Sequence, residues 1–257
     1  MKILVIGDVT SPSGVEHLGR KLWKFRKERE IDFCVVNGEN ASFISGINDE
    51  QAEALIRGGA DCITGGNHTM HQRRAYTMLD EREELIRPAN YGDRAPGRGY
   101  TVLDCNGYRV LVMNVMGVVH IEPTLDSPFD TVDKILRETE GKYDVSILDI
   151  HAEATGEKLA IAHHLDGRVN IVFGTHTHVP TADEQILPRG TGYITDVGMC
   201  GESNGILGME AERVIERMRT RVPLPFKVSE GDVVANGVIF TLDMTSYKIT
   251  DIERIKL

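Results

Sequence analysis

Short apolar runs alternate with stretches in which apolar residues recur every three or four positions along most of the chain. Short apolar runs are typical of buried strands, and the wider spacing is typical of amphipathic helices. The alternation therefore predicts an α/β protein with largely buried strands. We predict strands over 2–6, 32–36, 60–63, 109–115, 144–150 and 170–173. We predict helices over 15–30, 49–57, 70–80, 131–140, 153–164 and 209–219.

The C-terminal part of the chain follows a different pattern. Residues 192–195, 237–243 and 248–255 read as strands joined by short turns, which is typical of an antiparallel sheet edge. We therefore expect a second sheet. The stretch 85–99 is rich in Pro and Gly and is predicted to be a loop. We expect a single domain over 1–257, in which the segment near 69–100 is the candidate for a small cap or lid.

Charge and composition narrow the classes of function. A net charge of -10 argues against a protein that binds the phosphate backbone of duplex nucleic acid. A small anionic substrate stays possible if a bound cation supplies positive charge. The four cysteines are scattered without a CxxC pair, which fits a reducing cytoplasm. No apolar run is long enough for a signal peptide or a membrane span, so we expect a cytoplasmic protein without membrane contact.

Polar residues able to bind a metal follow five of the predicted strands. They are Asp8 after the first strand, Glu39 and Asn40 after the second, Asn67 after the third, His151 after the fourth, and His176 and His178 after the fifth. Ligands bind beyond the carboxyl ends of strands in open α/β sheets, so one pocket can collect these side chains. The set lacks thiolate and suits Mn, Fe, Zn or Mg. It exceeds one tetrahedral site, and a shared carboxylate would bridge two ions about 3.5–4 Å apart.

Each of these residues also has an ordinary structural explanation. Asp8 could cap a helix or stabilise a turn, and Asn40 and Asn67 could occupy left-handed turn positions. A lone histidine such as His151 is more often structural than a ligand. Five strand ends that all carry such residues are hard to explain in this way, and this coincidence favours the metal site.

The order Gly-Asp, Gly-Glu-Asn, Gly-Asn-His, His and Gly-Thr-His-Thr-His resembles the calcineurin-like metallophosphoesterase superfamily. The N-terminal strand with Asp8 and the runs 36–41, 64–68 and 195–199 look more narrowly like the YmdB-like bacterial phosphodiesterases, and this likeness covers nearly the whole chain. The superfamily usually begins with Asp-x-His, whereas this chain has Thr10 in place of the histidine. Its second motif is usually Gly-Asp, whereas this chain has Gly38-Glu39, as in the YmdB-like subgroup.

The resemblance implies a metallophosphoesterase-type sandwich of two mixed β-sheets flanked by helices, with a small cap. It also implies two divalent or trivalent ions, iron or manganese, and 2′,3′-cyclic nucleotides as small nucleotide substrates. The residues implied for one metal are Asp8, Glu39, Asn40 and His178, and those implied for the other are Glu39, Asn67, His151 and His176. Glu39 would bridge the two ions.

The mechanism that we expect is attack on phosphorus by a metal-bridging hydroxide, with His68 as the catalytic proton donor to the leaving ribose oxygen. The same metal site would also serve a phosphomonoesterase or nucleotidase. A third possible function, which belongs to a different functional class, is a nucleotide-binding regulatory protein with weak turnover. The sequence leaves a homo-oligomer open.

Overall fold

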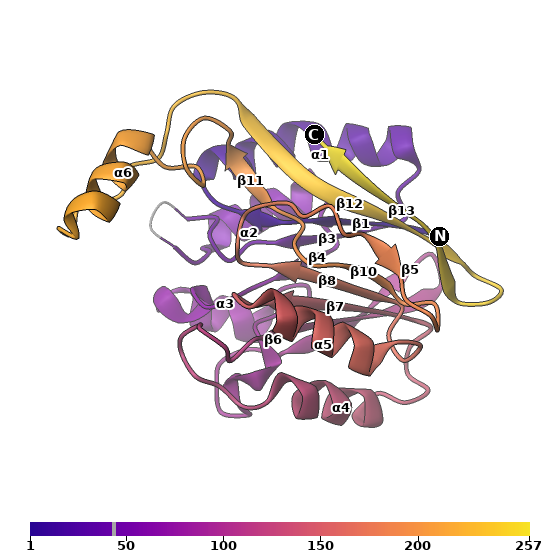
Figure 1. Cartoon of the computed structure of the whole chain (residues 1–257). Coiled ribbons are helices and arrows are strands. Elements are labelled where there is room, and N and C mark those ends of the chain that lie inside the picture. The colour runs from indigo at the N-terminus through magenta and orange to yellow at the C-terminus, as the bar shows by residue number, and fades with distance from the viewer. Residues whose placement is uncertain (43–44) are drawn as a thin grey trace.

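Two β-sheets pack face to face, and helices cover the outer face of each sheet (Figure 1). The computed structural model describes residues 1–42 and 45–257. Helices α1 and α2 lie on one side of the sandwich, and α4 and α5 lie on the other (Figure 1). The predicted sandwich of two mixed sheets flanked by helices is therefore confirmed.

The first sheet runs in the order β2-β11-β12-β1-β3-β4, and β13 pairs with β12. Strands β1, β3 and β4 are parallel neighbours, whereas β12 pairs antiparallel with β1 and with β13. The bounds are β1 Lys2–Ile6, β2 Asp8–Val9, β3 Phe33–Asn37, β4 Cys62–Thr64, β11 Met199–Glu202, β12 Val233–Asp243 and β13 Lys248–Lys256.

The second sheet runs in the order β5-β6-β7-β8-β10-β9. Strands β6, β7, β8 and β10 are parallel, and the outer strands β5 and β9 pair antiparallel. The bounds are β5 Tyr100–Cys105, β6 Tyr108–Met116, β7 Val145–His151, β8 Ile171–Thr175, β9 Gln185–Ile186 and β10 Gly192–Ile194.

Alternate residues of the strands point into different layers of the core. In β1, Ile3 and Val5 face the second sheet, whereas Leu4 and Ile6 pack beneath the helices. All four side chains are fully buried. Burial of such a side chain contributes roughly 1.5–3 kcal/mol to folding. A strand that is buried on both faces has to be apolar throughout, which is why the sequence shows a run instead of an alternation.

The helices begin and end at recognisable capping residues. Helix α1 starts after Ser11, whose side chain accepts a hydrogen bond from Gly14, and helix α2 starts with a capping box of Asn48 and Gln51. The bounds are α1 Pro12–Arg29, α2 Asp49–Gly58, α3 Ala75–Glu81, α4 Pro128–Glu138, α5 Thr155–Leu165 and α6 Ala211–Thr220. Short 3₁₀ turns lie at Thr69–His71 (η1) and Ala89–Tyr91 (η2).

Two sequence predictions were wrong in detail. The tail strands β12 and β13 pair antiparallel, as expected, but they extend the first sheet and do not form a sheet of their own. Strand β10 lies parallel to β8 in the second sheet. Pattern alone shows that strands exist but not which edge they join. The helix predicted over 70–80 begins only at Ala75, because the Thr69 hydroxyl accepts a hydrogen bond from Gly66 and the chain takes a 3₁₀ turn there.

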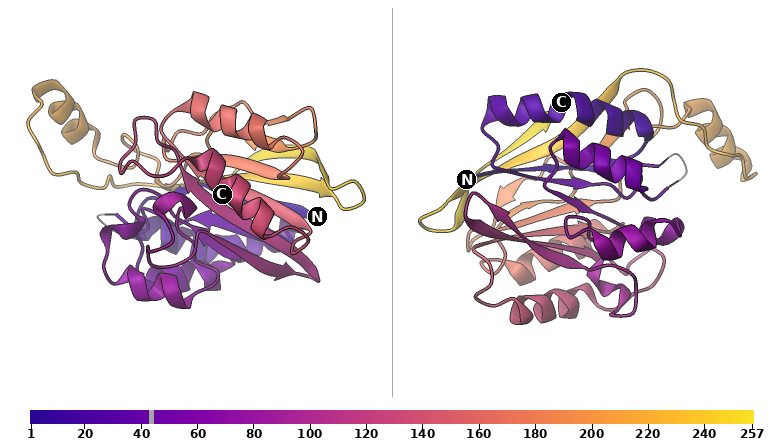
Figure 2. Two further views of the ribbon diagram at one scale, coloured as in Figure 1. Left: turned by 90° about the horizontal axis from the view of Figure 1, so that it is seen from below. Right: turned by 180° about the vertical axis from the view of Figure 1, so that it is seen from behind.

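The segment 203–232 connects β11 to β12 and carries α6; we call it the arm. In both Figures 1 and 2, α6 lies outside the four layers of the sandwich. The segment near 69–100, which the sequence suggested as a cap, holds η1, α3 and η2. None of the helices in the described ranges combines the length and the apolar character that crossing a membrane requires.

Candidate metal centre

The predicted polar residues lie where strands of both sheets end. Asp8 follows β1, Glu39 and Asn40 follow β3, and His151 is the last residue of β7. Because β1 and β3 are parallel in one sheet and β7 and β8 are parallel in the other, their carboxyl ends lie at one edge of each sheet. The sandwich brings these two edges together, so residues that are distant in sequence become neighbours.

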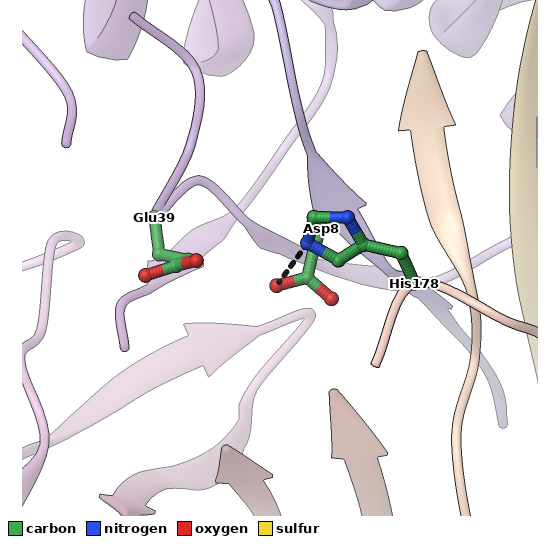
Figure 3. A group of neighbouring side chains, drawn as sticks. All are labelled: Asp8, Glu39 and His178. Carbon is green, nitrogen blue, oxygen red and sulfur yellow. Dashed lines mark ion pairs between the residues drawn. The ribbon is translucent and has the colours of Figure 1, made fainter. Parts of the chain in front are cut away.

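Three of these side chains form a compact group (Figure 3). One ligand atom from each of Asp8, Glu39 and His178 lies within 4.8 Å of the others. The His178 Nε2 atom is 3.9 Å from Asp8 Oδ1. Both carboxylate side chains are fully buried, and His178 is only 17% exposed. The arrangement offers two oxygen ligands and one nitrogen ligand to a cation.

A second group lies directly beside the first and is centred on His151. Its Nε2 atom is 2.9 Å from the Asn67 Oδ1 atom and 3.1 Å from the His176 Nδ1 atom. It is also 3.7 Å from Glu39 Oε2. Glu39 is therefore the carboxylate that faces both groups, which is the position that a bridging ligand would need.

Asn40 and His68 both contact Glu39. The Asn40 amide nitrogen donates a hydrogen bond to Glu39 Oε1, so this side chain reaches the centre through its neighbour. The His68 backbone nitrogen donates to Glu39 Oε2 at 3.0 Å, and its ring Nδ1 lies 3.1 Å from Oε1. The His68 side chain is 30% exposed, so it is accessible from outside while it touches the centre.

Burial dominates the electrostatics of the centre. It raises the pKa of Asp8 well above the usual value, and the charges of Glu39 and Asp196 raise it further. Burial also opposes ionisation of Glu39, but His151 and His68 outweigh it, so the pKa of Glu39 is lowered to about 2. Two carboxylates in one dry pocket repel each other unless positive charge lies between them. The centre thus favours a cation.

Burial lowers the pKa of the candidate histidine ligands. The pKa of His151 falls well below its usual value, and the pKa values of His176 and His178 are also lowered, in each case with burial as the largest cause. Neutral imidazole is the form that binds metal. For His68, burial lowers the pKa, but the hydrogen bond and the charge of Glu39 outweigh it, so the net shift is upward.

Three features of the pocket fit a metal. The buried Asp8 Oδ1 atom has no hydrogen-bond partner among the described residues, although a buried carboxylate oxygen normally has one. A Cβ atom on Gly66 would lie 2.4 Å from His151 Nε2, so only glycine leaves this nitrogen accessible. The donors are carboxylate, amide and imidazole, which suit hard and borderline cations.

A buried hydrogen-bond chain sets the tautomer of His151. Thr175 Oγ1 donates to Asp149 Oδ1 at 2.7 Å, and it lies 3.0 Å from His151 Nδ1. Because the single hydroxyl proton is used on Asp149, the threonine oxygen accepts from Nδ1–H, which leaves Nε2 free as a ligand. Support of this kind fixes the orientation of metal-binding histidines.

The turn after β8 holds two candidate ligands in an uncommon backbone conformation. His176 and His178 have φ angles of 99° and 65°. Non-glycine residues seldom adopt positive φ, and such positions concentrate at functional sites. The His176 backbone nitrogen donates to Asp8 Oδ2 at 3.0 Å. Asp196 Oδ2 accepts from the Thr177 backbone nitrogen at 3.2 Å and from its hydroxyl at 2.9 Å.

The structure thus brings together all seven predicted ligands and His68, and it removes one alternative explanation. Asp8 does not cap α1, because Ser11 does. Lys158 is a further support, because its Nζ atom donates to the Thr175 carbonyl at 2.7 Å and to Asp196 Oδ2 at 2.8 Å. Sequence reasoning missed the supporting residues Asp149, Lys158 and Thr175. The charge of Asp149 inside an apolar strand was a signal that could have been used. Lys158 gave no signal, because a lysine on a helix normally faces solvent.

The sandwich of two mixed sheets, with carboxylate, amide and imidazole side chains gathered at the strand ends, is the arrangement that the resemblance to the metallophosphoesterases implied. The sequence model of the YmdB-like protein family matches residues 4–255. The chain belongs to this family.

Individual relatives agree with this assignment. A Bacillus subtilis (strain 168) protein named 2′,3′-cyclic-nucleotide 2′-phosphodiesterase is 42% identical over 255 residues, which cover 99% of this chain and 96% of the relative. The crystal structure of a hypothetical protein from Thermus thermophilus has a TM-score of 0.93 at 37% identity and covers 100% of this chain and 99% of its own. The crystal structure of a phosphatase from Mycoplasma pneumoniae has a TM-score of 0.93 at 32% identity. The match covers 100% of this chain and 93% of the Mycoplasma chain.

Proposed function

We propose that this chain is a metal-dependent phosphodiesterase that opens 2′,3′-cyclic nucleotides. The observation that carries the proposal is the buried cluster of Asp8, Glu39 and His178 beside the His151 group, with an unpartnered oxygen on Asp8 among the described residues. The activity named for the Bacillus subtilis relative supports the choice of substrate. The reaction adds water across the bond between phosphorus and O2′ and leaves a nucleoside 3′-phosphate.

We assign the seven candidate residues to two cations. Asp8, Asn40 and His178 would serve one cation, Asn67, His151 and His176 would serve the other, and Glu39 would serve both. When bound, the cations would supply an activated water and neutralise negative charge on the phosphate. Iron or manganese fits the oxygen and nitrogen donors. The positive charge also resolves the conflict between an anionic substrate and a chain of net charge -10.

The roles of the other residues follow from their places. His68 touches Glu39 and is partly exposed, so it can reach a substrate above the centre. As the bond between phosphorus and O2′ breaks, His68 gives a proton to O2′, and it recovers a proton from the attacking water in the same turnover. Thr175 holds Nδ1 of His151 and so keeps Nε2 directed at the centre.

The test separates metal binding from proton transfer. Asn67→Ala removes a ligand and is expected to lower the metal content of the purified protein. His68→Ala is expected to keep the metal content and to lower kcat on 2′,3′-cyclic AMP by about 10²–10⁴-fold. The matched control is His163→Ala, since His163 is an exposed histidine on α5. If both site variants hydrolysed cyclic nucleotides at the wild-type rate, the proposal would be wrong.

A phosphomonoesterase is the second candidate, because the similar Mycoplasma pneumoniae structure is described as a phosphatase. A panel of 2′,3′-cyclic nucleotides, nucleoside monophosphates and p-nitrophenyl esters separates the two activities. Higher kcat/KM on monoesters than on cyclic nucleotides would favour the phosphatase. Elemental analysis of the same preparation is expected to give close to two metal ions per chain, and a metal-free preparation with full activity would contradict the metal assignment.

A further inference from the structure

A hollow of about 600 Å³ lies between the candidate metal centre and the arm. Its volume falls in the range of about 300–1,000 Å³ that is usual for small-molecule sites. One side of the hollow is formed by residues of the centre, among them Asn40, His68 and His178. The opposite side, which we call the arm wall, consists of Ile206, Leu207, Met209, Val214, Met218 and Phe226.

The two sides of the hollow differ in chemistry. The side at the centre offers imidazole and amide groups, whereas all six side chains of the arm wall are apolar. Large apolar side chains on the arm wall are exposed: Met218 is 65% exposed, Phe226 is 53% exposed and Leu207 is 43% exposed. Adjacent exposed apolar side chains mark a surface that binds something. A ligand that fills the hollow must therefore be polar at one end and apolar at the other.

Phe226 is the aromatic member of the arm wall, and the guanidinium group of an arginine lies against its ring. The guanidinium carbon of Arg217 lies 4.4 Å from the centroid of the ring. Arg217 and Phe226 also line a smaller neighbouring hollow, but only Phe226 of the two lines the one at the centre. Phe226 therefore borders both hollows, as do Val214 and Met218, whereas Arg217 lines only the smaller one.

We propose that the arm wall is the nucleobase subsite of this enzyme. The inference rests on the proposed function, because it takes the phosphate of the cyclic nucleotide to bind at the metal centre. A nucleotide has the required asymmetry, with an anionic phosphate at one end and a flat, largely apolar base at the other. Stacking of a base on an aromatic side chain contributes substantially to binding. It depends little on which base is bound, because every base has a π-face.

The composition of the arm wall also predicts specificity. None of its six side chains has a hydrogen-bonding group that could read the edge of a base. Thr10, Ser42, Ser45 and His71 also line the hollow, but they lie outside the arm wall. A base seated on the arm wall is therefore held by stacking and apolar contact, and we expect the enzyme to require a base without selecting which one. We expect kcat/KM for the four 2′,3′-cyclic nucleotides to lie within about tenfold of one another, since a hydrophobic pocket discriminates weakly.

The experiment compares 2′,3′-cyclic AMP with methyl β-ribofuranoside 2,3-cyclic phosphate, which has the same reacting ring but no base. The wild type is expected to prefer cyclic AMP by about tenfold or more in kcat/KM. Phe226→Ala and Met218→Ala are expected to remove most of this preference through KM, because they leave the reacting atoms untouched. Phe226→Tyr keeps an aromatic ring and should retain the preference.

Ile215→Ala is the matched control. Ile215 lies on α6 and is 46% exposed, but it does not line the hollow, so its replacement should leave the preference intact. Light scattering on each variant reports the mass in solution. If Phe226→Ala lowered activity on both compounds equally and changed the mass, the arm wall would bind a second copy of the chain and the inference would be overturned.

Two further outcomes separate the inference from the proposed function. Equal wild-type kcat/KM on the base-bearing and base-free compounds would overturn the nucleobase subsite while leaving the phosphodiesterase in place. Inactivity of the metal-loaded wild type on both compounds would overturn the proposed function, and the subsite that rests on it would fall with it.

Discussion

Lys158 is expected to be the residue outside the metal centre whose loss damages it most. The side chain is fully buried on α5, and its Nζ atom donates to the Thr175 carbonyl at 2.7 Å and to Asp196 Oδ2 at 2.8 Å. Asp196 in turn accepts from Thr177, between the two histidines of the turn after β8. Replacing Lys158 by Met keeps the length of the side chain but removes its charge and its hydrogen bonds.

The expected loss of stability follows from the unpaired carboxylate that the substitution leaves in the core. Lys158→Met leaves the Asp196 carboxylate buried without its cation, although Thr177 and Gly198 still donate to it. Removal of one partner from a buried ion pair costs about 3–5 kcal/mol. In a chain of this size each kcal/mol shifts Tm by about 2–4 °C, so a fall in Tm of about 10 °C is expected.

The assay is urea unfolding of wild type and variant in chelator, so that bound metal does not contribute to the measured free energy of unfolding. Lys21→Met is the matched control, because Lys21 is an exposed lysine on α1. A double variant that adds Asp196→Asn should recover part of the loss, since it removes the unpaired charge. Metal content measured without chelator should fall in Lys158→Met, because the turn with His176 and His178 loses its support.

Two results would refute this reasoning. One is a free energy of unfolding for Lys158→Met within about 1 kcal/mol of the wild type, because breaking a buried ion pair should lower the stability by more than that. The other is a double variant less stable than Lys158→Met alone. Unchanged metal content in a destabilised variant would show that the ion pair supports the fold but not the turn.

Two further substitutions probe the centre directly. Thr175→Val removes the acceptor of His151 Nδ1–H and is expected to weaken metal binding by about 10–100-fold, measured by competition with a chelator. Thr175→Ser keeps the hydroxyl and should bind metal like the wild type. If Thr175→Val and the wild type had equal metal affinity, the orienting role of Thr175 would be excluded. Gly66→Ala places a methyl group 2.4 Å from His151 Nε2 and should abolish metal binding while the circular dichroism spectrum stays native. The control Gly19→Ala meets no atom within 4 Å and should bind metal normally.

The strands that carry the site were predictable because their burial is extreme. The prediction for β1 has the bounds that the structure shows, and β3, β7 and β8 lie within a residue or two of their predicted ranges. Every residue of these strands except Lys2 is buried, so each strand appears in the sequence as a clear apolar run. Strand β5 was missed, because its burial is partial and its sequence Tyr-Thr-Val-Leu-Asp-Cys mixes both kinds of residue.

The pairing of strands was not predictable from pattern. Strand β12 lies between β11 and β1, although more than 200 positions separate it from β1 in the sequence. Its sequence, which mixes apolar and polar residues, does not specify a partner strand, and only the packing of the whole sandwich decides where it pairs. The same holds for the arm, whose predicted helix exists as α6 but whose place beside the centre has no local signal.

Ligands and their supports differ in how they can be recognised. Several candidate ligands directly follow a glycine near the end of a strand, and both features leave a pattern in the sequence, as with Gly66 and Asn67. A supporting residue such as Lys158 acts from the middle of a helix, where the chemistry of its surroundings depends on contacts made across the fold. Burial turns an ordinary lysine into a structural cation, and burial is a property of the folded chain. For this reason the side chains that would bind metal are foreseeable from the sequence, whereas the side chains that hold them in place become visible only in the structure.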